Sequence, residues 1–396
     1  MNFSHRTSWH RQQNALTQLL DEKKQRGDTI LDLTLTNPTE CGFHYPEQEI
    51  LSTLSHPEIL RYHPDPHGLL SAREAVAEYY GKKNVIVNPE KIFLTASTSE
   101  AYSFVFKLLC NAGENVLVPT PSYPLFEYLA QVNDVGLQDY HLFYDHGWHV
   151  DTESLNRSIN ESTKAIIIVH PHNPTGMFLK KNEYEEIKKI ARKHNLALIV
   201  DEVFNEYALD SDAEVISTAN ETDVLTFTLN GISKMCGLPQ MKLGWLIVSG
   251  QPSMVEEACE RLEILCDTYL SVNTPVQIGL HALLRAGISL RQQIQTRTKN
   301  NHLWLNNLLN TSNGHPTTHI SYQTSEGGWS AILRVPVIKS DEKWAIELLD
   351  IKAILVYPGY FFDFENEGYL VLSLLVKEDD FQHGVQELIA YVESCV

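Results

Sequence analysis

The chain is 396 residues long, and 43% of its residues are hydrophobic while 20% are charged. So much apolar material can fill one large or two medium cores, which excludes a small scaffold held together by disulfides or metals. Its 31 lysines and arginines stand against 50 aspartates and glutamates, and this net charge of −19 disfavours nucleic acids and anionic membrane surfaces as partners.

The sequence gives no signal for export or membrane insertion. Residues 1–11 are polar and contain no apolar signal core, and no apolar run approaches the ~20 residues that a membrane helix needs. The six cysteines are scattered without a Cys-x-x-Cys pair, which is typical of reduced thiols and not of a disulfide framework or a zinc site. We therefore expect a cytoplasmic protein that holds no metal.

Helix and strand patterns alternate over residues 70–250. Several of the expected strands are continuous runs of Val, Ile and Leu, as in buried parallel strands with helices on both faces. The alternation predicts an α/β fold built on a mostly parallel sheet. We expect helices over 72–80, 99–109 and 182–193, and strands over 91–95, 115–118, 164–169, 196–200, 223–227 and 244–249.

Beyond residue 250 the pattern changes, and a smaller α+β domain is expected. Residues 252–310 are mostly helical in pattern, and the boundary falls within a long helix over 275–310. We expect an N-terminal arm (1–50) that joins a small C-terminal domain (286–396), and a large domain (51–285) that holds the site. In the small domain we expect strands over 328–336 and 369–375, and helices near 341–350 and 380–393.

Lys234 is the first candidate for chemistry at the carboxyl edge of the sheet. Neither GxGxxG nor GxxxxGK[ST] occurs in the sequence, so the usual nucleotide-binding loops are absent. Lys234 follows a strand, and it could be a Schiff-base nucleophile if burial or a positive neighbour such as Lys242 lowers its pKa. A lone Ser-Lys pair is more often part of a surface loop, and that alternative stays open at this point.

Asp201 and Asn173 also follow apolar strands. A carboxylate at the end of a buried strand needs a cationic partner, such as a protonated pyridine nitrogen, although Asp201 could equally cap a helix. Asn173 lies in the turn His170–Gly176, where its amide could bind a ligand oxygen or serve the turn alone. His170 and His172 are too few to indicate a metal site.

A predicted helix N-terminus offers an anion site. Ser97 and Glu100 form a capping box, a pattern that alone is common. The free N–H groups of that N-terminus, with the hydroxyls of Ser97, Thr98 and Ser99, form a cradle for phosphate. Tyr123 follows another strand and could stack on a flat heteroaromatic ring, although an isolated tyrosine is more often a core or turn residue.

In this order the motifs resemble those of the pyridoxal-phosphate (PLP) enzymes of fold type I, specifically the class I/II aminotransferase family. The resemblance extends from Leu33–Thr39 (LTLTNPT) to Gly368–Leu375 (GYLVLSLL), and Asn37 in the first motif is a candidate substrate-binding residue. It implies a PLP-dependent aminotransferase that moves an amino group between an amino acid, or amine, and a keto acid. It also implies a homodimer with the site at the interface.

The family's roles carry over to individual residues. By resemblance, Lys234 holds PLP as an internal aldimine and moves a proton, and Asp201 keeps the pyridine nitrogen protonated. Asn173 binds the ring hydroxyl, and Tyr123 stacks on the ring. Ser97, Thr98 and Ser99 bind the phosphate with the help of Ser233, and Tyr62 reaches the phosphate of the neighbouring subunit.

Three positions depart from the family pattern. Phe204 stands where a tyrosine hydroxyl would contact the ring oxygen, and Tyr207 is a possible substitute. Lys242 stands in place of a phosphate-binding arginine, keeping the charge without the bidentate fork. Val371 replaces the arginine that grips the substrate α-carboxylate, which valine cannot imitate. Arg334, Arg6 and Arg11 are the candidates to replace that cation.

These departures leave other functions open. Phe204 and Val371 favour, as an alternative, a PLP-dependent lyase, cyclase or decarboxylase of specialised amino-acid metabolism on the same fold. A third class is a PLP-binding regulator without turnover. The retention of Lys234, Asp201 and Asn173 argues against it, because a scaffold needs none of these side chains.

Overall fold

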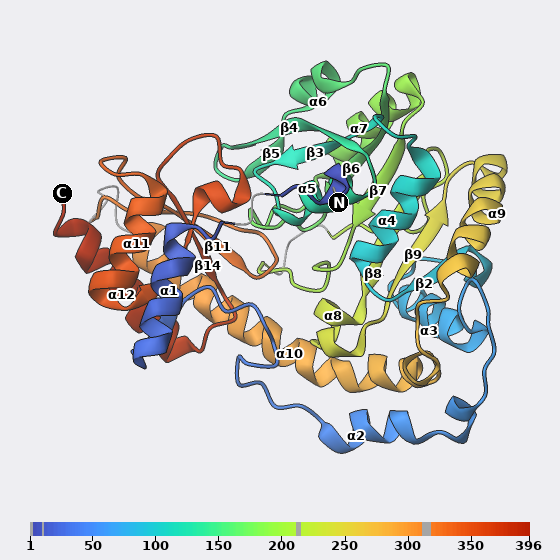
Figure 1. Cartoon of the computed structure of the whole chain (residues 1–396), viewed down its shortest axis with the longest axis horizontal. Coiled ribbons are helices and arrows are strands. Elements are labelled where there is room, and N and C mark those ends of the chain that lie inside the picture. The colour runs from blue at the N-terminus through green and yellow to red at the C-terminus, as the bar shows by residue number, and fades with distance from the viewer. Residues whose placement is uncertain (1–2, 10–11, 211–214, 311–317) are drawn as a thin grey trace.

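A large sheet and a small sheet, each covered by helices, divide the molecule (Figure 1). The computed structural model describes residues 3–9, 12–210, 215–310 and 318–396. None of the helices in these ranges combines the length and the apolar character that crossing a membrane requires.

The large sheet has eight strands in the order β2-β9-β8-β7-β6-β3-β4-β5. Strands β3, β6, β7 and β8 are parallel neighbours, as the Val, Ile and Leu runs predict. Separate buried clusters cover its two faces, so helices lie on both sides. The strands are β2 (Ile92–Thr95), β3 (Asn115–Thr120), β4 (Gly136–Tyr144), β5 (Trp148–Val150), β6 (Thr163–Val169), β7 (Ala197–Asp201), β8 (Thr226–Gly231) and β9 (Gly244–Ser249).

Helices surround this sheet, and the predicted α/β class is confirmed. Their amphipathic sequences bury one side each, as in α7, where Ile187 and Ala191 pack inward. The helices are α2 (Glu47–Ser52), α3 (Leu70–Gly81), α4 (Thr98–Leu109), α5 (Leu125–Val132), α6 (Thr152–Ser158), α7 (Lys181–His194), α8 (Ile232–Met235) and α9 (Pro252–Tyr269), with short 3-10 turns at His5–Thr7, Thr53–Ser55, Pro57–Leu60, Pro89–Lys91 and Pro239–Met241.

One strand prediction in this region was wrong, and another was confirmed in its limits. The strand expected over 223–227 lies at Thr226–Gly231, because the apolar Val224 is buried outside the ladder. The strand at Gly244–Ser249 has the predicted limits but is antiparallel to both of its neighbours. The short connection from β8 through α8 returns the chain at the same edge of the sheet, which forces the reversed direction.

The small region contains an antiparallel sheet in the order β10-β11-β14-β13, with its own buried core. The 37-residue helix α10 (Thr274–Asn310) passes from one region to the other, and residue 286, the expected domain boundary, lies inside it. The elements are β10 (Ser321–Gln323), β11 (Ser330–Arg334), β13 (Tyr357–Pro358), β14 (Tyr369–Ser373), α1 (Ala15–Arg26), α11 (Asp341–Lys352), α12 (Glu378–Glu393), the 3-10 turn Gly359–Phe362, and the pair β1 (Leu31–Asp32) with β12 (Ile354–Leu355).

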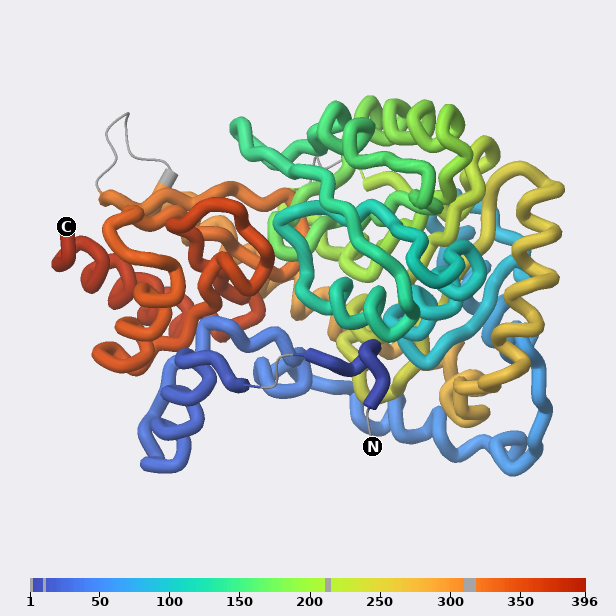
Figure 2. The backbone as a smooth tube through the Cα atoms, turned by 45° about the horizontal axis from the view of Figure 1, so that its top comes forward, coloured from blue at the N-terminus to red at the C-terminus, as the bar shows by residue number. Residues whose placement is uncertain are grey.

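The N-terminal arm contacts both regions (Figure 2). Its strand β1 pairs with β12 of the small region. Further upstream, Arg6 donates to Asp134 at 2.7 Å, and Gln131 donates to the carbonyl of His5 at 3.2 Å, so this stretch lies against α5 of the large region. The expected domain limits therefore stay a prediction.

Candidate active site

Four of the predicted site residues lie at one edge of the large sheet. The carboxyl ends of β3, β6, β7 and β8 share this edge because the strands are parallel. Tyr123 follows β3, Asn173 follows β6, Asp201 ends β7 and Lys234 follows β8 within α8. A ligand at this edge would therefore meet side chains that are far apart in the sequence.

Lys234 and Asp201 form a coupled pair in a dry environment. Burial lowers the pKa of Lys234, and the Asp201 carboxylate acts in the opposite direction. Burial raises the pKa of Asp201 to about 6, although the Val203 N–H donates to it at 3.0 Å and the Tyr102 hydroxyl at 3.2 Å. The pair thus combines an amine whose protonated form is disfavoured by burial with a carboxylate whose ionised form is disfavoured in the same way.

Aromatic rings enclose the lysine. Its Nζ lies 5.2 Å from the ring centroid of Trp329 and 5.9 Å from that of Phe204. The hydroxyl of Tyr207 donates to the main-chain carbonyl of Lys234 at 2.6 Å, and Tyr207 is fully buried. Because that hydroxyl already donates to the carbonyl of Lys234, the structure does not support Tyr207 as a substitute for a tyrosine at position 204.

Asn173 links the two sheets. The hydroxyl of Ser330, on β11, donates to its Oδ1 at 3.2 Å. The turn closes through Gly176, whose φ of +70° and close approach to Gly327 admit no side chain. No residue in the described part of the chain accepts from the amide nitrogen of Asn173, so its donors face the site unused.

The histidines of this turn serve the fold. Burial lowers the pKa of His170 to about 4 and that of His172 to about 3. The His170 ring accepts from the Leu179 N–H at 2.8 Å, and the His172 ring lies 2.9 Å from the Thr175 hydroxyl. Over the ranges that the structure describes, no three His, Cys, Asp or Glu side chains gather as metal ligands.

The predicted anion cradle lies at the N-terminus of α4. Ser97 accepts from the Glu100 N–H at 3.1 Å, as the expected capping box requires, but the Glu100 carboxylate accepts from the Ala96 N–H at 2.7 Å in place of the Ser97 N–H, so only half of the box forms. Thr98 and Ser99 are half-buried in the first turn, and Ser233 is half-buried beside Lys234. The cap thus uses the Ser97 hydroxyl, while the first-turn N–H groups still face outward.

Gly244 brings Lys242 toward this cradle. A Cβ on Gly244 would lie 3.2 Å from the Ser97 carbonyl carbon and 3.3 Å from the Thr95 hydroxyl, so only glycine allows the two segments to approach so closely. Lys242, just before this point, is exposed. The main chain two residues after Lys242 therefore lies against the start of α4, where a cation would favour a bound phosphate.

Two predicted residues lie outside this cluster. Tyr62 is 76% exposed and lines a small hollow with Asp65 and Leu270, among others, but with none of the residues around Lys234. Asn37 is held in a local turn, where its Oδ1 accepts from Thr39 and its Nδ2 donates to Glu40 at 2.8 Å. A single chain therefore brings neither residue to the lysine.

The three arginines proposed to replace the missing cation have different placements. Arg6 is bound to Asp134. Arg334 lies over the Tyr369 ring, with its guanidinium carbon 4.1 Å from the centroid. Arg11 lies outside the described residues. Val371 itself is only 2% exposed on β14.

Sequence reasoning missed three residues of the site: Tyr102, Trp329 and Ser330. Tyr102 lies one helical turn into α4 behind the capping box, a spacing that could have identified it as a partner of Asp201. Trp329 and Ser330 come from the small region, and no local motif connects them with Lys234.

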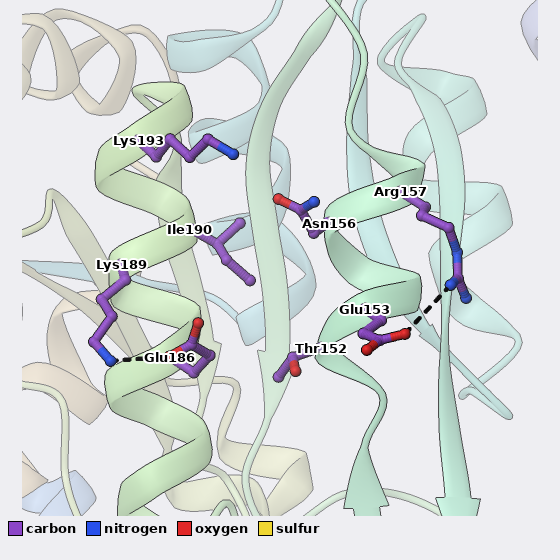
Figure 3. Close-up of a pocket in the computed structure, with 8 residues that line it drawn as sticks. All are labelled: Thr152, Glu153, Asn156, Arg157, Glu186, Lys189, Ile190 and Lys193. Atoms are coloured by element: carbon purple, nitrogen blue, oxygen red, sulfur yellow. Dashed lines mark hydrogen bonds and ion pairs between the residues drawn. The ribbon is translucent and has the colours of Figure 1, made fainter.

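A hollow of about 500 Å³ lies elsewhere, on the outer surface between α6 and α7 (Figure 3). Its charged side chains pair with one another, Lys189 with Glu186 at 3.0 Å and Arg157 with Glu153 at 3.7 Å. It contains none of the residues around Lys234 and no perturbed group comparable to the lysine–aspartate pair. The sheet edge is therefore the candidate active site.

Comparisons with known proteins concern the chain as a whole. The family model described as aminotransferase class I and II matches residues 43–388. The chain is 27% identical over 381 residues to glutamate-pyruvate aminotransferase AlaA of Haemophilus influenzae, covering 94% of this chain and 92% of that protein. It is 28% identical over 383 residues to an alanine aminotransferase of Mycobacterium tuberculosis, covering 93% and 86%. The solved alanine aminotransferase of Pyrococcus furiosus has the same fold, with a TM-score of 0.88 at 23% identity and coverage of 99% and 100%.

Proposed function

Because the chain belongs to the aminotransferase class I and II family, we propose that it binds PLP at Lys234 and moves an amino group between an amino acid, or amine, and a keto acid. The pair of Lys234 and Asp201 carries this proposal. Burial lowers the pKa of the lysine and raises that of the carboxyl. The shift of the lysine pKa favours the neutral amine that a nucleophile needs.

The side chains at the sheet edge fit PLP. Asp201 is buried, and two hydrogen bonds from described residues leave its charge only partly compensated, which suits a protonated ring nitrogen. The free amide donors of Asn173 suit a ring hydroxyl, and Tyr123 suits a ring face. The phosphate would be held by the N-terminus of α4 with Ser97, Thr98, Ser99, Ser233 and Lys242.

When bound, PLP supplies an electron sink for the bond that breaks at the substrate carbon. Lys234 would supply the base, because burial lowers its pKa and so favours the amine form that can take a proton from that carbon and return it. Tyr207 holds the main chain of Lys234 through its 2.6 Å hydrogen bond, so the side chain starts from a fixed point. The rings of Phe204 and Trp329 lie beside the amine.

The proposed assembly is a homodimer. Tyr62 is exposed on a loop outside its own chain's site. In a dimer, this tyrosine would reach the phosphate of the neighbouring subunit. Sedimentation or light scattering of the wild-type protein tests the assembly, and a Tyr62→Phe variant that binds PLP unchanged would remove this role.

The cofactor proposal is tested by trapping. Borohydride reduction of PLP-loaded protein, followed by peptide mass mapping, should attach the cofactor to Lys234. Mixing holoenzyme with amino donors should convert the bound cofactor to its aminated form, as followed by absorbance. Release of ammonia, carbon dioxide or a rearranged amine without that conversion would instead favour the lyase, cyclase or decarboxylase alternative raised by Phe204 and Val371.

A further inference from the structure

A buried tyrosine contacts the carboxylate that the proposed function pairs with the cofactor ring. Tyr102 is the fifth residue of α4 and is 3% exposed. Its hydroxyl donates to Oδ2 of Asp201 at 3.2 Å. The strand β7 sets this contact. Ile199 on β7 belongs to the buried cluster that contains Tyr102, on the side of the sheet that α4 covers (Figure 1). Residues two apart in a strand point to the same face, so the side chain of Asp201 also points toward α4.

Neighbouring rings hold Tyr102 in this position. Its ring centroid lies 5.3 Å from that of Phe126, at an interplanar angle of 78°, and 6.0 Å from that of Phe106. Edge-to-face contacts of this kind are favourable for aromatic pairs. Burial and the Asp201 carboxylate raise the pKa of Tyr102 well above its ordinary value. The phenol therefore keeps its proton and remains a hydrogen-bond donor.

The two oxygens of Asp201 accept from different segments. The Val203 N–H donates to Oδ1 at 3.0 Å, and Tyr102 donates to Oδ2. Rotation of the carboxylate about its last bond would break these hydrogen bonds, so together they fix its plane. Each oxygen still has room to accept a second hydrogen bond. Since both donors are neutral, they stabilise the carboxylate and leave its charge for a cationic partner.

The charged neighbours of Asp201 do not replace Tyr102. Beyond burial, the like-charged Glu202 raises the pKa of Asp201, and Lys234 lowers it. Lys234 is the residue proposed to join the cofactor, so its ammonium group is lost when the cofactor is loaded. Among the described residues, the Val203 N–H and the Tyr102 hydroxyl are then the donors that favour the ionised carboxylate.

We propose that Tyr102 is a positioning residue, which holds Asp201 in the plane and in the ionised form that a protonated ring nitrogen requires. The helix α4 then serves two parts of the cofactor: its first turn offers N–H groups to the phosphate, and its second turn holds the carboxylate for the ring. This inference rests on the proposed function and deepens it, because it concerns the same site.

The experiment compares PLP with its deaza analogue, in which a carbon replaces the ring nitrogen. Both compounds keep the aldehyde, the hydroxyl and the phosphate, so they differ at the atom that Asp201 would contact. Each is titrated into cofactor-free wild type and Tyr102→Phe, and equilibrium dialysis gives the dissociation constants. We expect the variant to bind PLP about tenfold more weakly, since a hydrogen bond to a charged group is lost, and to bind the analogue within about twofold of the wild type. Equal weakening of both compounds, or of neither, overturns the inference.

Two controls separate positioning from packing. The Tyr102→Phe variant keeps the ring and its contacts with Phe106 and Phe126. Tyr184→Phe is the matched control, since Tyr184 is 7% exposed and its hydroxyl donates to the Glu221 carboxylate at 2.7 Å. It should bind both compounds as the wild type does, and a loss of PLP binding as large as that of Tyr102→Phe overturns the inference.

A background without the carboxylate tests the route of the effect. In Asp201→Asn protein, the further change Tyr102→Phe should leave the ratio of the two dissociation constants unchanged, because the two residues act through one contact. A further change of the ratio in that background shows that Tyr102 acts by another route and overturns the inference.

Borohydride reduction distinguishes a failure of this inference from a failure of the proposed function. If reduction of the PLP-loaded wild type attaches the cofactor to Lys234, the proposed attachment stands whatever the ratio of dissociation constants shows, and the ratio alone decides the role of Tyr102. A wild type that is not labelled at Lys234 overturns both the proposed function and this inference.

Discussion

The edge of the large sheet and the facing side of the small sheet differ sharply in their polar content. At the edge, Lys234 and Asp201 shift each other's pKa, and Asp201 accepts from Tyr102 and Val203. The facing side presents Tyr357, Val371 and Ile332, with no charged member. One surface is built for fixed charges, and the other is built for packing.

Charged groups and apolar packing are thus divided between the two sheets: the charged side chains lie at the edge of the large sheet (the polar layer), and the apolar ones lie on the small sheet (the facing layer). Cofactor chemistry depends on groups fixed at the ends of strands, where a substitution alters a buried charge. The facing side of the small sheet instead contributes Val371 and Ile332, which are buried and pack into a cluster on the large sheet. The departures from the family pattern accordingly leave Lys234, Asp201 and Asn173 in place in the polar layer, although Phe204 lies beside the lysine there.

The largest expected effect comes from the polar layer. Lys234→Ala removes the base and the cofactor attachment point, and we expect kcat to fall by about 10²–10⁴-fold or more. Steady-state transamination with the best donor measures it, and borohydride labelling of the chain should disappear. Lys180→Ala, which removes a lysine bound to Glu326 outside this pair, is the control. Activity within tenfold of the wild type would contradict the role of Lys234.

Asp201 tests the electrostatics of the same layer through pH. Its pKa of about 6 in the folded protein lies above the ordinary value of 3.8. An acidic group whose pKa is higher in the folded than in the unfolded protein favours folding at low pH. This contribution to the free energy of unfolding is lost as the pH rises through the folded pKa. Relative to Asp201→Asn, the cofactor-free wild type should therefore lose about 1–2 kcal/mol of unfolding free energy between pH 5 and pH 7.5. Urea unfolding at both pH values measures this, and a pH-independent difference would show that the carboxylate stays fully ionised.

The polar layer could be predicted from sequence because each of its residues follows a recognisable strand. Apolar runs end at Asp201 or lead to Asn173 and Lys234. Because parallel strands end at one edge of the sheet, each run predicts where its polar residue lies. The capping at Ser97 is also local and was confirmed.

The facing layer could not be predicted in this way. The pairing of Tyr357 with Val371, and the contact of Ser330 with Asn173, join segments that no spacing rule relates. The antiparallel direction of β9 is likewise not readable from its apolar composition, because it depends on how the chain turns after β8. The sequence shows that position 371 is a valine and not an arginine, whereas the neighbours of Val371 become known only from the fold.

A smaller effect separates positioning from packing. Tyr207→Phe removes the hydroxyl that holds the Lys234 carbonyl, and Tyr140→Phe removes an equally buried phenol that donates to the Ile167 carbonyl at 2.8 Å. Each should cost about 1 kcal/mol of unfolding free energy, the usual worth of such a bond. Only the Tyr207 variant should also shift the pH titration of the bound cofactor's absorbance. If both variants shift it, or neither does, the Tyr207 hydroxyl is structural alone.

The smallest expected effect is at the exposed margin of the polar layer. Lys242 is exposed and lies beside the start of α4. An arginine there would keep the charge and add a bidentate fork for phosphate, so Lys242→Arg should tighten PLP binding by about two- to fivefold. Because the site is exposed, raising the salt concentration should remove most of this gain. Equilibrium dialysis at low and high salt measures it, with Lys189→Arg on the outer face of α7 as the control. A gain shared by both variants would reflect net charge rather than contact, and the phosphate would then rest on the helix N-terminus and its hydroxyls alone.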